Sequence, residues 1–218
     1  MLLKTNVFLA EIIGTFALVF CGTGAIVINS ITDGSVTHMG IAITFGAIVM
    51  SLIYSLGEVS GAHINPAVTI AFWIAGRFKA SLVLPYIAAQ TIGAFLASYT
   101  LLWLFPETAT LGETLPHGAV MQSFILEFIL TYLLMLVIIQ VATGSKEQGL
   151  MAGIAIGTVV MLEALFAGPI SGASMNPIRS LAPAVANGNT QHLWIYLTAP
   201  ILGAVSSVFT WRLLKTNK

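Results

Sequence analysis

The sequence predicts an all-α membrane protein in which six transmembrane helices and two re-entrant half-helices form an inverted repeat. Three observations predict this fold class. Of the 218 residues, 57% are hydrophobic and only 7% are charged. Six apolar stretches are long enough to cross a bilayer. A short polar motif also occurs twice, at equivalent places between these stretches.

The composition makes a lipid bilayer the expected surroundings of the protein. A soluble surface needs roughly a quarter of its residues to be charged, far more than this chain has. The 8 Lys and Arg residues balance the 8 Asp and Glu residues, so nucleic acid has no basic patch to bind. The single cysteine, Cys21, excludes an intrachain disulfide, and the four histidines lack the spacing of metal ligands. We therefore expect no metal and no cofactor.

The six apolar stretches approach the roughly 20 residues that a helix needs to cross the hydrocarbon core. In chain order, we expect transmembrane helices over residues 7–29, 39–57, 82–104, 119–142, 149–167 and 193–213. The polar motifs lie between the second and third spans and between the fifth and sixth. Each motif runs into an apolar segment that is too short to span the membrane, residues 67–74 and 178–185.

The two motifs belong to an internal repeat. Ser60-Gly61-Ala62 and Asn65-Pro66 recur as Ser171-Gly172-Ala173 and Asn176-Pro177, with the same internal spacing. Glu11 and Thr15 in the first span likewise match Glu127 and Thr131 in the fourth. We expect one transmembrane domain over residues 1–218, built from halves 1–104 and 119–218. Because each half has three spans, the second half must be inverted, and one loop enters from each side.

Each motif predicts the start of a half-helix at membrane depth. Asn as N-cap followed by Pro at the first helical position signals a helix start. Two half-helices of about ten residues, each roughly 15 Å long, would together cross the bilayer with their N-termini meeting near its middle. Asn65 and Asn176 would offer amide donors there. The unwound stretches would offer backbone carbonyls, from Gly61, Ala62, His63, Gly172 and Ser174.

This arrangement favours small neutral molecules over ions. A row of acceptors with two donors at its centre can pass a molecule from one hydrogen bond to the next. The positive ends of both helix dipoles repel cations, which would also have to lose their hydration shells. The asparagine pair is expected to interrupt a proton wire.

The basic residues predict the orientation. The two termini and the 2–3 and 4–5 connections share one side of the membrane and hold seven of the eight Lys and Arg residues. Such an excess marks the cytoplasmic side. We therefore expect a multi-pass protein of the plasma or inner membrane with both termini in the cytoplasm. Arg179, the exception, follows the second motif on the opposite side.

The strings YSLGEVSGAHINPAVTIAF and AGPISGASMNP resemble the aquaporin, or major intrinsic protein, family, in particular its nodulin-26-like branch and that branch's bacterial relatives. The first motif, Asn65-Pro66-Ala67, is the family signature, whereas the second departs from it at Ile178. The resemblance covers nearly the whole chain and implies a homotetramer with one pore per subunit. It also implies a narrow outer filter, wider and less polar than a water-specific one, formed by Phe45, Ala164, Ala173 and Arg179.

Three glutamates inside the spans need separate interpretation, because intramembrane ionisable residues are functional by default. We expect Glu11 and Glu127 to accept backbone hydrogen bonds from the re-entrant loops rather than to relay protons. Glu163, beside Ala164, leaves two readings open. It either faces another helix as a neutral or hydrogen-bonded group, or approaches the pore entrance and acts on Arg179.

Together these features predict a passive channel, not an enzyme. Its expected solutes are glycerol and other small polyols, water, and neutral boric, arsenous or silicic acid. A water-selective channel is the main alternative. A secondary transporter also uses inverted repeats and broken helices, but no residues form an evident coupling-ion site. The expected partners are the lipid bilayer and the solutes themselves.

Overall fold

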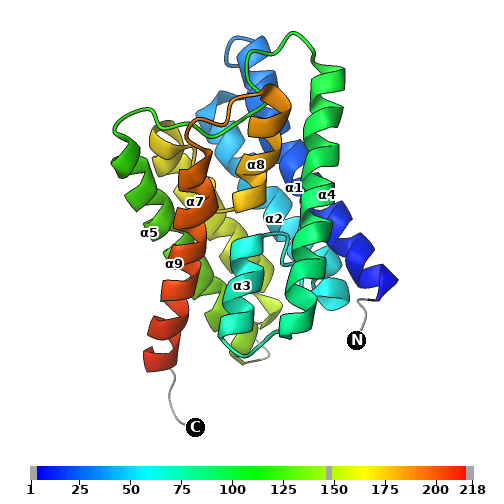
Figure 1. Cartoon of the computed structure of the whole chain (residues 1–218), viewed down its shortest axis with the longest axis vertical. Helices are drawn as coiled ribbons and strands as arrows, with labels where there is room; N and C mark the ends of the chain where they lie inside the picture. Colours follow the sequence, from blue (N-terminus) through cyan, green and yellow to red (C-terminus); the bar gives the residue numbers. More distant parts are fainter. Residues whose placement is uncertain (1–3, 146–148, 215–218) are drawn as a thin grey trace.

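The computed structural model describes residues 4–145 and 149–214, and within these residues every regular element is a helix (Figure 1). Six of the helices are long and apolar enough to cross a membrane. They are α1 (Thr5–Ile31), α2 (Thr37–Ser60), α4 (Ala80–Leu104), α5 (Val120–Thr143), α7 (Ala152–Ser171) and α9 (Leu193–Leu214). Two shorter helices, α3 (Pro66–Ile74) and α8 (Pro177–Asn187), follow α2 and α7. The predicted six spans and two half-helices are confirmed.

One predicted boundary differs for a clear physical reason. The fifth span was predicted to stop at residue 167. Pro169 lies just beyond, and proline in a helix removes a helical hydrogen bond. Instead α7 continues through Pro169 to Ser171. Pro169 leaves the carbonyl of Leu165 without its helical partner, and that oxygen accepts a hydrogen bond from His38 Nε2 of α2 at 2.6 Å. A neighbouring helix therefore replaces the lost bond.

The two halves of the chain pack in the same way. α1 packs on α4 and α5 packs on α9, while α2 and α7 join the halves. A Cβ added to Gly93 of α4 would lie 2.3 Å from the carbonyl oxygen of Ile12, and one added to Gly203 of α9 would lie 2.2 Å from that of Phe128. The crossing of α2 and α7 depends in the same manner on Gly46 and Gly157. Such glycines let helix backbones approach closely.

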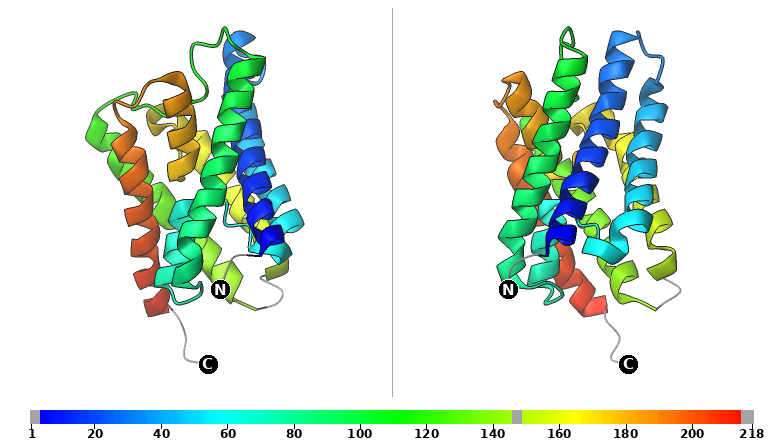
Figure 2. Two further views of the ribbon diagram at one scale, coloured as in Figure 1. Left: turned by 45° about the vertical axis from the view of Figure 1, so that its right-hand side comes forward. Right: turned by 90° about the vertical axis from the view of Figure 1, so that its right-hand side faces the viewer.

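The half-helices lie end to end within the bundle. In Figure 1, α3 occupies the half of the molecule in which α1 begins and α9 ends, and α8 occupies the opposite half. The two further views keep this arrangement (Figure 2). The segments that lead into α3 and α8 therefore enter from opposite ends of the molecule, as the inverted repeat predicts, and the two N-termini meet between them.

Candidate functional site

Both half-helices begin where the motifs predict. The Oδ1 atom of Asn65 accepts a hydrogen bond from the N–H of Ala67 at 2.9 Å, and Pro66 is the first residue of α3. Asn176 caps α8 in the same way, accepting from the N–H of Ile178 at 3.1 Å. Proline suits the first helical position because its missing N–H would have no partner within the helix. In each motif, the helix start thus fixes the side-chain oxygen of the asparagine and leaves its Nδ2 group for other partners.

The two asparagines tie the half-helices to each other. Asn65 Nδ2 donates to the carbonyl of Met175 at 2.8 Å, and Asn176 Nδ2 donates to the carbonyl of Ile64 at 2.9 Å. Each amide group has two N–H donors. One donor of each asparagine is therefore used across the junction, which leaves a second for a molecule beside the pair.

The loops before the half-helices have unfavourable backbone conformations. Ile64 and Met175 have φ angles of 43° and 54°, and Ala62 and Ala173 have angles of 47° and 42°. This left-handed region is costly for residues other than glycine, most of all for a β-branched one such as Ile64. Neighbouring groups must hold these loops in shape. The same strain in both loops follows from the repeat.

Glu11 and Glu127 supply that support from α1 and α5. The donors to Glu11 are the Ser60 hydroxyl and the N–H groups of His63 and Ile64, at 2.7, 3.0 and 2.8 Å. The donors to Glu127 are the Ser171 hydroxyl and the N–H groups of Ser174 and Met175, at 2.8, 2.9 and 2.9 Å. Each carboxylate thus satisfies buried backbone donors that no helix could satisfy.

Other side chains that hold the two loops were not predicted from the sequence. The hydroxyl groups of Tyr86 and Tyr196 donate to the carbonyls of Ser60 and Ser171, both at 2.7 Å. These two tyrosines occupy equivalent positions in α4 and α9, so an alignment of the two halves beyond the motifs could have found them. The first loop has an additional partner, since Gln90 Nε2 donates to Glu11 Oε2 at 2.8 Å.

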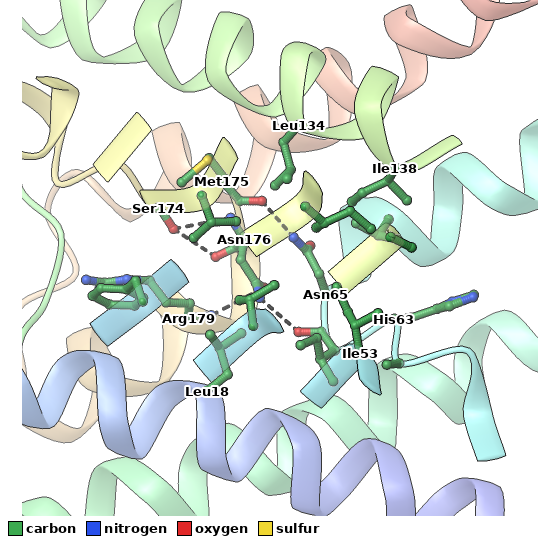
Figure 3. A pocket seen from close by; sticks show the side chains of 18 of the residues that line it. Leu18, Ile53, His63, Asn65, Leu134, Ile138, Ser174, Met175, Asn176 and Arg179 are labelled. Atoms are coloured by element: carbon green, nitrogen blue, oxygen red, sulfur yellow. Dashed lines mark hydrogen bonds between the residues drawn. The ribbon is translucent and has the colours of Figure 1, made fainter. Parts of the chain in front are cut away.

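A cavity of about 140 Å³ is lined by both asparagines. Its wall includes all four expected filter residues, Phe45, Ala164, Ala173 and Arg179, and four residues of the expected carbonyl row, Gly61, Ala62, His63 and Ser174. Arg179 and His63 lie on opposite sides of the asparagine pair (Figure 3). Gly172, the fifth residue predicted for that row, is not part of the wall: it caps the C-terminus of α7 with a φ angle of 86° and lies against Thr114. Much of the remaining wall is apolar, including Leu18, Val49, Leu134, Ile138 and Val160.

Arg179 places a cation at one end of this cavity. The residue is only 2% exposed, and its Nη1 donates to the carbonyl of Gly112 at 2.6 Å. Its guanidinium carbon lies 5.1 Å from the ring centre of Phe45, a cation–π contact. The guanidinium group has five N–H donors, and its buried Nε has no partner among the described residues. Arg179 therefore combines a fixed charge with spare donors.

Glu163 does not share the cavity wall. Its side chain is 5% exposed, and neither carboxyl oxygen has a hydrogen-bond partner within the described residues. Of the two readings of Glu163, its absence from the cavity wall favours the one in which it faces another helix.

Ile178, the departure in the second motif, packs away from the cavity. It belongs to an apolar cluster with Val19 of α1 and with Ala94 and Ala97 of α4. Its backbone N–H still donates to the capping asparagine. The larger side chain therefore fills space between helices and leaves the half-helix start unchanged.

Comparison with known proteins agrees with this geometry. A family model described as "Major intrinsic protein" matches residues 2–211. The chain is 47% identical to Aquaporin NIP1-2 of Arabidopsis thaliana, over 95% of this chain and 73% of that protein. It is 46% identical to Putative aquaporin NIP4-1 of the same plant, over 97% and 75% of the two chains.

A solved structure is also similar over nearly its full length. The aquaglyceroporin from Plasmodium falciparum has a TM-score of 0.86 and 27% sequence identity, covering 94% of each chain. The resemblance to nodulin-26-like proteins is confirmed, with relatives from plants. The chain therefore belongs to the major intrinsic protein family of membrane channels.

Proposed function

We propose that the protein is a passive channel for glycerol and other small polyols, water, and neutral boric, arsenous and silicic acid. The observation that carries this proposal is the presence of two alanines, Ala164 and Ala173, in the same cavity wall as Phe45 and Arg179. Alanine methyl groups leave room for molecules larger than water. Phe45 offers an apolar face and Arg179 offers donors, which suits a polyol with one carbon face and one hydroxyl face.

Exclusion of charge is the second part of the proposal. The N-terminus of each half-helix carries a partial positive charge of about half an electron, and both face the asparagine junction. Arg179 adds a full charge at one end of the cavity. The apolar wall offers few groups to replace a lost hydration shell, so an ion would meet both repulsion and a desolvation cost.

The filter can be tested by narrowing it. The double substitution of Ala164→His and Ala173→Thr should lower glycerol permeability about tenfold relative to water permeability, since a small change in pocket width discriminates solutes to about this extent. Stopped-flow light scattering of proteoliposomes measures both rates. The matched control, Ala164→Ser with Ala173→Ser, adds hydroxyl groups with little volume and should keep a ratio near that of the wild type. An unchanged ratio in the His/Thr variant would rule out the proposed filter.

The solute range needs a panel measured on the wild-type protein. Water, glycerol, urea, boric acid and arsenous acid should be compared in the same proteoliposomes. Permeability to water alone would favour the water-selective alternative. Uptake that depends on an ion gradient would favour a secondary transporter instead.

We also propose a homotetramer in the plasma or inner membrane with cytoplasmic termini. Membership of the family supports the assembly, and the excess of Lys and Arg that the sequence predicts for the cytoplasmic connections and termini supports the orientation. Native mass spectrometry should give four times the monomer mass. Single cysteines at Arg77 and at Glu107, in a Cys21→Ser background, should react with an impermeant reagent from the cytoplasmic and the external side respectively.

A further inference from the structure

The connection between α4 and α5 is anchored to half-helix α8 by three consecutive residues. The carbonyl of Gly112 accepts from Arg179 Nη1 at 2.6 Å, and Thr114 Oγ1 donates to Ser180 Oγ at 2.7 Å. Between them, Glu113 Oε1 accepts from Asn187 Nδ2 at 3.0 Å. Residues 112–114 therefore contact both the first turn of α8 and its last residue.

The backbone of this segment has little freedom. Gly112 has a φ angle of 68°, and a Cβ at this position would lie 2.7 Å from Thr23 of α1. Leu111, the preceding residue, is completely buried. These contacts restrain the Gly112 carbonyl from its N-terminal side, which leaves its other side to the residues that follow.

Arg179 depends on that carbonyl. It is buried, and its Nε has no partner in the described part of the chain. A buried guanidinium needs hydrogen bonds to offset the loss of water. The Gly112 carbonyl supplies one of these bonds, so a movement of the segment would change how Arg179 is presented to the cavity.

Glu113 has an unusual environment for a loop residue. Besides Asn187, the side chain of Asn189 donates to Oε1, at 3.4 Å, while Oε2 is buried without a partner among the described residues. Burial raises the pKa of this carboxyl above its ordinary value, and the hydrogen bonds from the two asparagines oppose that rise only in part. By contrast Glu107, in the same connection, is exposed.

We propose that Glu113 is a positioning residue for Arg179: it ties residues 112–114 to the far end of α8 and thereby fixes the Gly112 carbonyl that holds the guanidinium. This inference rests on the proposed function, because it assigns Glu113 an indirect part in solute selection. Its effect should appear in the ratio of two permeabilities, whereas general damage to the fold would lower both permeabilities together.

The test uses the full-length protein in proteoliposomes, with glycerol, water and methylammonium as probes. Glu113→Ala should change the glycerol-to-water ratio about threefold, an effect typical of one lost hydrogen bond, and should raise methylammonium leak. Arg179→Ala sets the upper limit of both changes. Glu113→Gln keeps an oxygen that can accept from Asn187 and should restore much of the wild-type ratio. Glu107→Ala removes the same charge from the same connection and should match the wild type.

A partner substitution keeps the proposal testable if Glu113→Ala fails to fold. Asn187→Ala removes the main donor to Glu113 and should change the ratio in the same direction, and combining it with Glu113→Ala should add little. A wild-type ratio in Glu113→Ala or in Asn187→Ala would overturn the proposal while leaving the channel intact. A wild-type protein with no permeability above that of bare lipid would instead refute the proposed function.

Discussion

Buried glutamates in this protein occupy two contrasting environments. Glu11 and Glu127 each accept three hydrogen bonds from a strained loop, so their burial is compensated. Glu163 is also buried, at 5% exposed, yet both of its oxygens lack partners within the described residues. An unsatisfied buried polar group costs free energy, whereas a satisfied one is close to neutral or favourable. The contrast indicates that Glu11 and Glu127 support the loops, whereas Glu163 leaves a buried polar group unsatisfied.

Replacing Glu163 should therefore stabilise the protein. The repeat places Leu52 of α2 at the position equivalent to Glu163, counting back from Ser60 and Ser171. We expect Glu163→Leu to increase the free energy of unfolding by about 1–3 kcal/mol, the cost of one unsatisfied group, with unchanged glycerol flux. Thermal unfolding in detergent checks the first point. Glu127→Leu, which removes three hydrogen bonds, should destabilise the protein and serves as the opposing control. A lower unfolding temperature for Glu163→Leu would mean that the carboxyl has a stabilising partner.

Single residues also differ in how well the sequence predicted them. Asn65, Asn176 and the two supporting glutamates could be found because each occurs twice at a fixed spacing. The left-handed backbone of Ile64 could not, since intrinsic preference argues against it for a β-branched residue. Glu113 was not singled out either, because it lies outside the repeat and its partners are more than 70 residues away in the chain.

Among the helices, close approach is set by glycines at repeat-related crossings. Hydropathy predicted every span. It did not predict which helices pair, because the contact partners of Gly93 and Gly203 lie on α1 and α5, distant in sequence. The end of α7 was placed too early for a similar reason. The carbonyl freed by Pro169 finds its donor, His38, on another helix.

The crossing of α9 on α5 should not tolerate a larger residue. In Gly203→Ala, the new methyl group would lie 2.2 Å from a backbone oxygen, so a helix must move at a cost of about 1–3 kcal/mol. Gly57 is the matched control, because it is helical and nothing lies within 4 Å of its added Cβ. Gly57→Ala should raise stability by roughly 0.5–1 kcal/mol through helix propensity. Thermal unfolding of both variants distinguishes them, and equal stabilities would contradict the crossing described here.

At the scale of the whole molecule, the chain consists of two inverted halves. Together they form an asparagine junction that neither half has alone. Each half supplies a half-helix, an asparagine cap and a glutamate support, and the two asparagines donate across the junction to the opposite loop. Architecture and junction were predictable because both are duplicated in the sequence. The apolar character of much of the cavity wall was not, since its residues come from α1, α2, α5 and α7 and look in sequence like ordinary membrane-facing positions.

The most direct test of the proposed channel is the flux of glycerol and of water through the purified wild-type protein in sealed proteoliposomes. Stopped-flow scattering records both rates, with and without imposed sodium and proton gradients. A continuous path for neutral molecules predicts glycerol and water rates well above those of bare lipid, proportional to the solute gradient and indifferent to both ion gradients, with no ionic current. Rates equal to those of bare lipid, or glycerol uptake that saturates and follows an ion gradient, would contradict it.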